Sequence, residues 1–244
     1  MNEEPALAQG LESREASWRA RPASGVGPRV KICCMASIAE AWLAIHAGAS
    51  ALGFVSRMPS GPGPIEERLI AEIVATVPPG IATFLLTCET SADPIIEQQR
   101  LTRANTLQLV DAVAQGTYAA LRDALPGIGI VQVIHVTGPG SVDEAMTVAP
   151  EVDALLLDSG NPALAIKELG GTGRVHDWSL SRAICERSPV PVYLAGGLNA
   201  SNATEAFVQV APFGLDVCSG VRTDGALDPR KLSAFMAAAR PARV

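Results

Sequence analysis

The stretch VPVYLAGGLN, residues 190–199, passes from a short apolar segment directly into a turn with two adjacent glycines. Segments of similar character recur along the chain at Val30–Cys34, Ala51–Val55, Ile81–Leu86, Thr106–Val110, Gly129–Val136, Asp153–Leu157, Val190–Leu194 and Leu215–Cys218. Several are apolar at nearly every position, which is typical of parallel strands buried on both faces of a sheet. The pattern therefore predicts eight parallel strands.

The stretches between these segments carry helix signals. Ser37-Ile-Ala-Glu40 and Ser141-Val-Asp-Glu144 fit the capping box, in which a hydroxyl and a carboxylate satisfy free N–H groups at a helix start. Gly48 is placed to end the first helix in a left-handed conformation, and Asp228-Pro229 is a suitable start for the last helix. Strands alternating with helices predict a (β/α)₈ TIM barrel, with an open doubly wound sheet as the alternative.

Length and composition suit one large domain. A chain of 244 residues has the size of a single barrel. Apolar residues make up 48 % of it and charged residues 18 %, which is enough to fill a large core. Residues 1–28 show no sustained period and are predicted to be a disordered extension. We therefore expect the barrel to occupy residues 29–244.

Charge and cysteine usage disfavour several classes of partner. The formal net charge is −6 without a run of Lys or Arg, so a nucleic-acid partner is not expected. No apolar run reaches the roughly 18 residues of a spanning helix, and the N-terminus lacks the layout of a signal peptide. The five cysteines form neither a metal spacing nor an even disulfide framework. We expect a reduced, cytoplasmic protein without a membrane partner; its oligomeric state stays open.

A barrel carries its chemistry at the carboxyl ends of its strands, and two glycine turns fall there. Gly196-Gly197 follows the seventh segment, and Ser219-Gly220 follows the eighth. Bare backbone N–H groups near a helix start can hold a phosphate, although tight turns may need glycine for their geometry alone. The cluster with Gly171 and Gly173, after the sixth segment, would close over the same ligand.

Two residues at strand ends are candidates for proton transfer. Asp158 follows three leucines, and burial there would raise its pKa as a general acid requires; capping the next turn is the alternative. Cys33 would act as a base if its pKa fell, although a buried cysteine is often only a small hydrophobic residue. Strand alternation places Lys31 and Cys33 on one side, and Asp216 and Cys218 on one side of the eighth strand. If both face inward, Lys31 and Asp216 form an ion pair that favours the Cys33 thiolate.

The histidines give no further site by themselves. His46 is expected on a helix surface, His135 near the end of the fifth strand, and His176 in the loop after the glycine cluster. No pair has the spacing of metal ligands, so we assign neither a metal nor a cofactor.

From about Val30 to Arg240 the chain resembles the phosphoribosylanthranilate isomerases. The resemblance rests on motifs in matching order: Lys31-Ile32-Cys33, Leu156-Leu157-Asp158, Gly170-Gly171-Thr172-Gly173-Arg174, Asp177-Trp178-Ser179-Leu180, Leu194-Ala195-Gly196-Gly197-Leu198-Asn199 and Asp216-Val217-Cys218-Ser219-Gly220-Val221. It implies a (β/α)₈ barrel and the Amadori rearrangement of an N-(5-phosphoribosyl) amine to a 1-deoxyribulose 5-phosphate.

The resemblance also implies roles for single residues. Cys33 would be the general base that takes the sugar C2 proton, and Asp158 the general acid that protonates the ring oxygen. The residues predicted to bind the substrate or its phosphate are Gly171, Gly173, Gly196, Gly197, Asp216, Ser219 and Gly220, together with Arg57 on the side of the aglycone.

The chain departs from the family pattern at three places. Cys34 stands where the family has glycine, and Val110 stands where it has histidine. After the second strand the family carries an arginine that binds the anthranilate carboxylate; Ser60–Pro64 has none, and Arg57 is the nearest substitute. Loss of such a contact costs about 1.5–3 kcal/mol, enough to change substrate preference. A paralogous isomerase with another substrate, and a phosphosugar-binding protein without turnover, therefore remain as alternatives.

Overall fold

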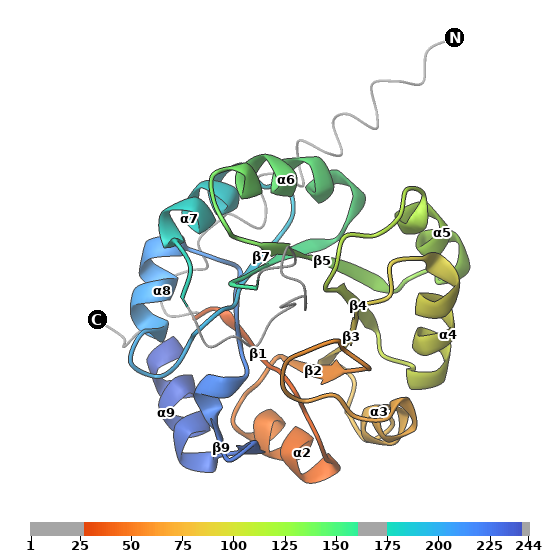
Figure 1. The fold of residues 1–244 in the computed structure, drawn as a ribbon. Helices are drawn as coiled ribbons and strands as arrows, with labels where there is room; N and C mark the ends of the chain where they lie inside the picture. Colours follow the sequence, from red (N-terminus) through yellow and green to blue (C-terminus); the bar gives the residue numbers. More distant parts are fainter. Residues whose placement is uncertain (1–26, 161–174, 241–244) are drawn as a thin grey trace.

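The computed structural model describes residues 27–160 and 175–240, which form a closed barrel of eight parallel strands surrounded by helices (Figure 1). The strands are β1 (Arg29–Ile32), β2 (Ala51–Val55), β3 (Ala82–Thr87), β4 (Thr106–Leu109), β5 (Gly129–His135), β6 (Ala154–Asp158), β7 (Val192–Leu194) and β8 (Gly214–Val217). Each strand pairs with the next, and β8 pairs with β1. The predicted barrel is confirmed, and the open sheet is excluded.

The helices follow the strands in sequence and form the outer layer. They are α2 (Ile38–His46), α3 (Glu67–Val74), α4 (Ala92–Thr102), α5 (Thr117–Ala124), α6 (Gly140–Val148), α7 (Trp178–Arg187), α8 (Ala203–Val210) and α9 (Pro229–Ala239). Short 3₁₀ turns η1 (Ala149–Glu151) and η2 (Ser219–Val221) follow α6 and β8. A small hairpin of β9 (Arg222–Thr223) and β10 (Ala226–Leu227) lies between η2 and α9.

Strand alternation divides the apolar residues into two cores. One core fills the layer between barrel and helices, and includes Leu52, Leu85 and Leu155. The other fills the inside of the barrel and includes Phe84 and Tyr193. Because both faces of each strand are covered, the strands read as continuous apolar runs in the sequence.

The helix signals are confirmed in three of four cases. The Ser37 side chain accepts a hydrogen bond from the Glu40 N–H, Gly48 has a φ of 98°, and Asp228 caps α9. The capping box predicted at Ser141 is wrong, because α6 already begins at Gly140. Ser141 instead donates to the carbonyl oxygen of His135 and thereby ties the helix start to β5.

The predicted ends of the first strand also need correction. β1 stops at Ile32 and does not continue to Cys34, because Cys34 has a φ of 65° and turns the chain out of the extended conformation. The predicted N-terminal extension lies almost entirely outside the described residues, so its boundary stays a prediction.

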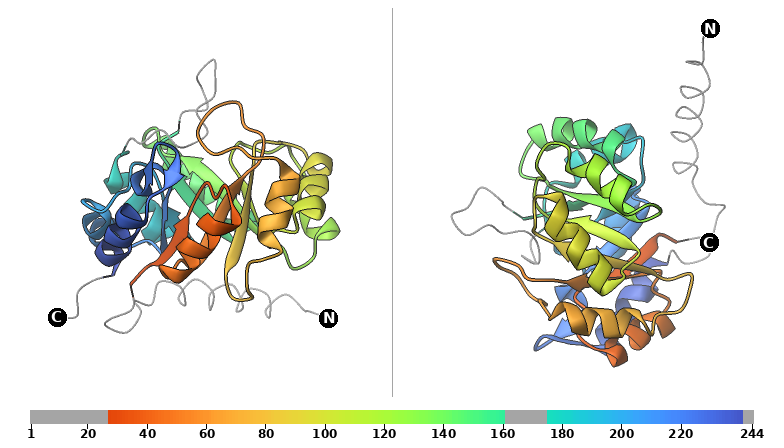
Figure 2. Two further views of the ribbon diagram at one scale, coloured as in Figure 1. Left: turned by 90° about the horizontal axis from the view of Figure 1, so that it is seen from below. Right: turned by 90° about the vertical axis from the view of Figure 1, so that its right-hand side faces the viewer.

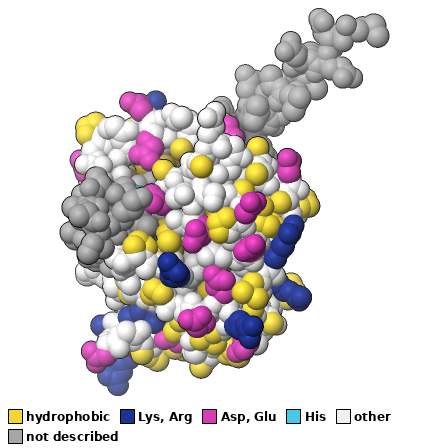
Figure 3. Space-filling model, turned by 45° about the vertical axis from the view of Figure 1, so that its right-hand side comes forward, with side chains coloured by type: hydrophobic (Ala, Val, Ile, Leu, Met, Phe, Trp, Pro, Cys, Tyr) yellow, Lys and Arg dark blue, Asp and Glu magenta, His cyan; other side chains and the backbone are white. Residues whose placement is uncertain are grey.

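Figure 2 shows the loop after β2 (orange) standing above one end of the barrel. On the face shown in Figure 3, basic side chains lie scattered among acidic and apolar ones. Within residues 27–160 and 175–240, none of the helices is both long and apolar enough to cross a membrane.

Candidate active site

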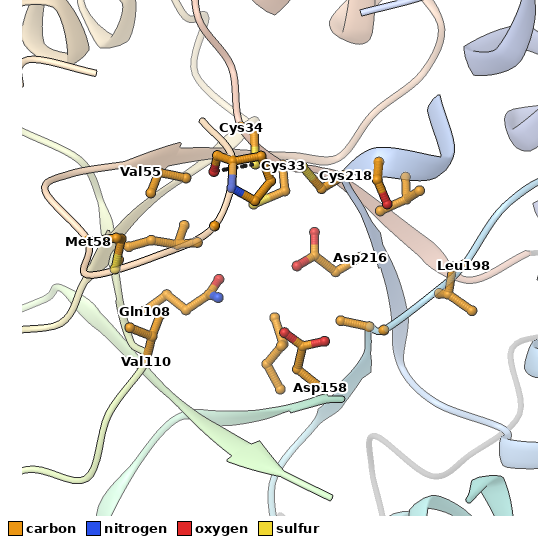
Figure 4. A pocket seen from close by; sticks show the side chains of 18 of the residues that line it. Cys33, Cys34, Val55, Met58, Gln108, Val110, Asp158, Leu198, Asp216 and Cys218 are labelled. Atoms are coloured by element: carbon orange, nitrogen blue, oxygen red, sulfur yellow. Dashed lines mark hydrogen bonds between the residues drawn. The ribbon is translucent and has the colours of Figure 1, made fainter. Parts of the chain in front are cut away.

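The carboxyl ends of the strands surround a pocket of about 730 Å³, a volume that includes its entrance from solvent. Figure 4 shows the carboxyl groups of Asp158 and Asp216 directed into the pocket, and Cys33 on the side opposite Asp158. The structure therefore brings the predicted acid and base into one pocket.

A buried ion pair lies beneath this pocket. Lys31 Nζ is 2.8 Å from Asp216 Oδ2, and these two residues are register partners in β1 and β8. The ion pair predicted from strand alternation is thus confirmed. Burial opposes the charge of Lys31, but the Asp216 carboxylate holds the pKa of Lys31 above its usual value. Asp216 Oδ1 has no partner among the described residues, so this atom remains available to a ligand.

Cys33 lies directly after β1, where a glycine on the next strand makes room for it. A Cβ atom on Gly53 would lie 2.8 Å from Cys33 Sγ and 3.0 Å from Lys31 Nζ. A hydrogen bond from Cys34 lowers the pKa of the Cys33 thiol; burial opposes this, and Lys31 adds to it. The thiolate, which is the form that can accept a proton, is therefore favoured.

Arg222 stabilises the turn that carries Cys33 through hydrogen bonds to its backbone. The Arg222 guanidinium donates to the carbonyl oxygens of Cys33 and Cys34, and it forms an ion pair of 3.0 Å with Glu40. Cys34 occupies a left-handed conformation that favours glycine. Arg222 thus stabilises a turn whose backbone geometry is unfavourable for cysteine.

Asp158 ends β6 in a buried environment. Burial raises the pKa of its carboxyl group, and a hydrogen bond of 2.7 Å from the Ser159 N–H opposes the rise. Its register partner His135 also opposes the rise, and contacts the Val110 carbonyl oxygen with Nε2 at 2.9 Å. The net rise means that Asp158 keeps its proton to higher pH than a solvated aspartate, as a general acid requires.

The two glycine turns after β7 and β8 pack directly on each other. Gly196 and Gly197 both have positive φ, at 82° and 64°. A Cβ atom on Gly220 would lie 2.0 Å from the Leu198 carbonyl oxygen, so only glycine allows this approach. The positive φ angles and the close contact at Gly220 both require glycine, and they bring the backbones of the two turns together.

Gly197 and Ser219, one from each turn, line the pocket. Within the described ranges, no hydrogen bond is found from the N–H groups of Gly197, Ser219 or Gly220. Successive free N–H groups form a concave site for an anion. The predicted binding residues Gly171 and Gly173 lie outside the described residues.

Arg57, a predicted site residue, lies away from the pocket. Its side chain is exposed and lines a separate surface hollow beside α3. The loop returns to β2 through a hydrogen bond of 3.0 Å from the Ile65 N–H to the Val55 carbonyl oxygen. Met58 and Pro62 of this loop line the pocket, while Arg57 lies outside it. The predicted contact of Arg57 with the ligand is therefore not supported.

Three residues in or beside the pocket were not identified as site residues from the sequence. Gln108 is buried on β4, lines the pocket and has no partner for Oε1 among the described residues. His176 lies near Asp158, since a Cβ on Gly196 would be 3.1 Å from His176 Nδ1 and 3.2 Å from Asp158 Oδ1. Burial lowers the pKa of His176 to about 4, so this ring is neutral.

Cys218 is the third, and its thiol contacts that of Cys34 at the pocket wall. The sequence held a signal for Gln108, because a polar residue in an apolar strand needs a reason to be buried, and for Cys218, because strand alternation placed it on the same side as Asp216.

The fold and the site together point to an enzyme on a (β/α)₈ barrel, with a carboxyl group and a thiol in one pocket at the strand ends. The chain belongs to the N-(5'-phosphoribosyl)anthranilate isomerase family, whose model matches residues 30–238.

Relatives and solved structures agree with this assignment. Phosphoribosylanthranilate isomerase 2 of Methanosarcina mazei is 35% identical over 85% of this chain and 92% of its own length. The isomerase of Haloferax volcanii is 36% identical over 88% and 94%. The phosphoribosylanthranilate isomerase structure from Thermotoga maritima superposes with a TM-score of 0.73, at 26% identity, over 87% of this chain and 98% of that one.

Proposed function

We propose that this protein catalyses the Amadori rearrangement of N-(5'-phosphoribosyl)anthranilate. The product is the corresponding 1-deoxyribulose 5-phosphate. One observation carries the proposal: in a chain of this family, a carboxyl group with raised pKa and a thiol with lowered pKa line the same pocket. Opposite shifts of this kind set up an acid and a base side by side.

The chemistry needs two proton transfers on the sugar. Protonated Asp158 gives its proton to the ring oxygen, the bond from that oxygen to C1 breaks, and the amine nitrogen forms a C=N bond to C1. The Cys33 thiolate then removes the proton from C2; the electrons of that C–H bond form a C1–C2 double bond, and the π electrons of the C=N bond return to nitrogen. The resulting enol becomes the ketone when C1 is protonated and the C2 hydroxyl proton is lost. Positioned groups of this kind each contribute roughly 10²–10⁴-fold to the rate.

The turns after β7 and β8 support binding of the phosphate group. Their N–H groups lie on the wall between Asp158 and Cys33, since β7 and β8 stand between β6 and β1. A phosphate held there would place the ribose across the pocket, within reach of both the acid and the base. No basic side chain is required, because backbone N–H groups alone can bind an anion.

The aromatic ring of the substrate faces the opposite wall in this arrangement. That wall is largely apolar, with Met58, Leu86 and Val110 around the Gln108 amide. We assign the anthranilate carboxylate to Gln108, because the side-chain amide is buried, leaves Oε1 unpartnered and can rotate to donate its NH₂ group. The apolar side chains would cover the ring.

The same wall favours one second candidate. With Arg57 outside the pocket, a neutral aglycone would fit as well as a carboxylate, so a paralogous isomerase for another phosphoribosyl amine remains the alternative.

The deciding experiment follows product formation by mass spectrometry. The purified chain is given N-(5'-phosphoribosyl)anthranilate and, separately, phosphoribosyl amines without a carboxylate. Conversion of the anthranilate compound with the higher kcat/KM, abolished in Asp158→Asn, supports the proposal. Turnover of a neutral substrate alone would establish the paralogue, and turnover of none would exclude both isomerases.

A further inference from the structure

Three thiols meet at the pocket wall between β1 and β8 (Figure 4). Cys33 and Cys34 follow β1, and Cys218 follows β8. The Cys218 thiol donates to Cys34 Sγ, and the two sulfur atoms are 2.6 Å apart. This distance is only about 0.6 Å longer than a disulfide bond of about 2.05 Å.

The backbone on both sides keeps Cys34 and Cys218 together. The Cys33 N–H donates to the Val217 carbonyl oxygen at 2.8 Å, which continues the β1–β8 ladder to the two thiols. Arg222 holds the Cys34 carbonyl oxygen, and the left-handed turn directs the Cys34 side chain toward β8. Since these contacts are already made, little movement is needed to join the sulfur atoms.

The two thiols differ in their access to solvent. Cys34 is 5% exposed, whereas Cys218 is only partly buried at the pocket wall. A small oxidant that enters the pocket therefore reaches Cys218 first, and Cys34 is in place to react with the product.

We propose that Cys34 and Cys218 form a redox-active thiol pair, which a peroxide converts to a disulfide at the rim of the active site. The Cys218 thiolate attacks one oxygen of hydrogen peroxide, and the O–O bond breaks to give a sulfenic acid and hydroxide. Cys34 sulfur then attacks the sulfenic sulfur; the S–O bond breaks, the S–S bond forms and hydroxide leaves. The protons of the two thiols convert both hydroxides to water. Two thiols are oxidised and one peroxide is reduced.

The disulfide has two consequences. It joins residues 184 positions apart and covalently links the first strand to the last. The bond reduces the conformational freedom of the unfolded chain and therefore raises the melting temperature. It also consumes the Cys34 thiol that hydrogen-bonds to Cys33. Without this donor, the Cys33 thiolate is less favoured and turnover at neutral pH falls; this consequence rests on the proposed function.

Peptide mapping tests the bond without reference to activity. The full chain is treated with hydrogen peroxide, free thiols are alkylated, and tryptic peptides are analysed by mass spectrometry. Trypsin places Cys34 in residues 32–57 and Cys218 in residues 188–222. We expect these peptides to appear cross-linked, and dithiothreitol to separate them.

Variants identify the sulfur atoms involved. Cys33→Ser should retain the cross-link, Cys34→Ser should lose it, and Cys88→Ser serves as a control that retains it. A cross-link that disappears in Cys33→Ser, or that is absent from the native chain, overturns the proposal. A cross-link in a chain without isomerase activity would instead leave the thiol pair standing and refute the proposed function. In an active enzyme, we expect peroxide to lower turnover and dithiothreitol to restore it.

Discussion

At the scale of single residues, the pocket shifts the pKa values of its two reacting groups toward each other. Burial is the main cause that raises the pKa of Asp158, and the hydrogen bond from Cys34 is the main cause that lowers the pKa of Cys33. Two ordinary side chains thus become an acid and a base through their surroundings. The family resemblance assigned these roles, but the pKa of Cys33 depends on a neighbour whose contribution the sequence did not suggest.

The pH dependence of turnover follows from these signs. Asp158 must be protonated, so activity falls as pH rises through the pKa of Asp158; Cys33 must be ionised, so activity rises with pH through the pKa of Cys33. We expect a bell-shaped profile of kcat/KM. Asp158→Asn should remove the descending limb and Cys33→Ser the ascending limb, each with kcat lower by roughly 10²–10⁴. A variant that keeps both limbs would contradict its assigned role.

The aglycone wall gives a second prediction at this scale. Gln108→Leu should lower kcat/KM for the anthranilate substrate by about ten- to a hundredfold, because one hydrogen bond to a charged group is worth about 1.5–3 kcal/mol. Arg57→Ala is the control and should change it little, since Arg57 lies outside the pocket. Steady-state kinetics of both variants provide the measurement. A larger loss of kcat/KM in Arg57→Ala than in Gln108→Leu would mean that Arg57 binds the anthranilate carboxylate.

At the scale of elements, turns rather than strands shape the site. Arg222 of β9 holds the turn after β1, although the two elements are far apart in the sequence. The turn after β8 packs against the turn after β7 through Gly220 and Leu198. The strands set the direction of each turn, and contacts between turns set its final position.

Gly220→Ala tests the contact between the phosphate turns. The new Cβ atom would overlap with the Leu198 carbonyl oxygen, so the two turns must separate. We expect a loss of about 1–3 kcal/mol in the free energy of unfolding, as for overpacking, and a KM about tenfold higher. Gly138→Ala is a suitable control, because nothing lies within 4 Å of its Cβ position. If the two variants had the same free energy of unfolding in urea and the same KM, the turns would not need the close approach of Gly220 to the Leu198 carbonyl oxygen.

At the scale of the whole molecule, the barrel closes where β1 pairs with β8. Lys31 and Asp216 lie on this seam, inside the barrel, where the surroundings are largely apolar. Taking two charges out of water is costly, and their mutual contact, together with the Cys33 sulfur and the Phe84 ring beside Lys31, offsets the cost. The free energy of unfolding should therefore fall when either Lys31 or Asp216 is lost.

Asp216→Asn measures this sensitivity. The change leaves the Lys31 charge buried without a counter-ion, and should lower the free energy of unfolding by about 3–5 kcal/mol. Glu186→Gln makes the same chemical change in the exposed pair with Arg182, and should cost less than about 1 kcal/mol. Replacing both charges, as in Lys31→Met with Asp216→Leu, should recover much of the loss. Urea denaturation of the variants checks the order; a small effect of Asp216→Asn would mean that water reaches Lys31.

The sequence by itself determined the barrel, its strand positions, the family, and the seam between Lys31 and Asp216. The barrel, its strands and the seam follow from local periodicity and strand alternation, which depend on neighbours along the chain, and the family follows from the resemblance of its motifs. Only the tertiary structure decided that Arg57 lies outside the pocket and that Ser141 lies within α6 rather than capping it. It also brought Cys218, Gln108 and His176 into the site. Such contacts join residues on different strands, and their distances depend on how loops fold back and pack, which no local pattern records.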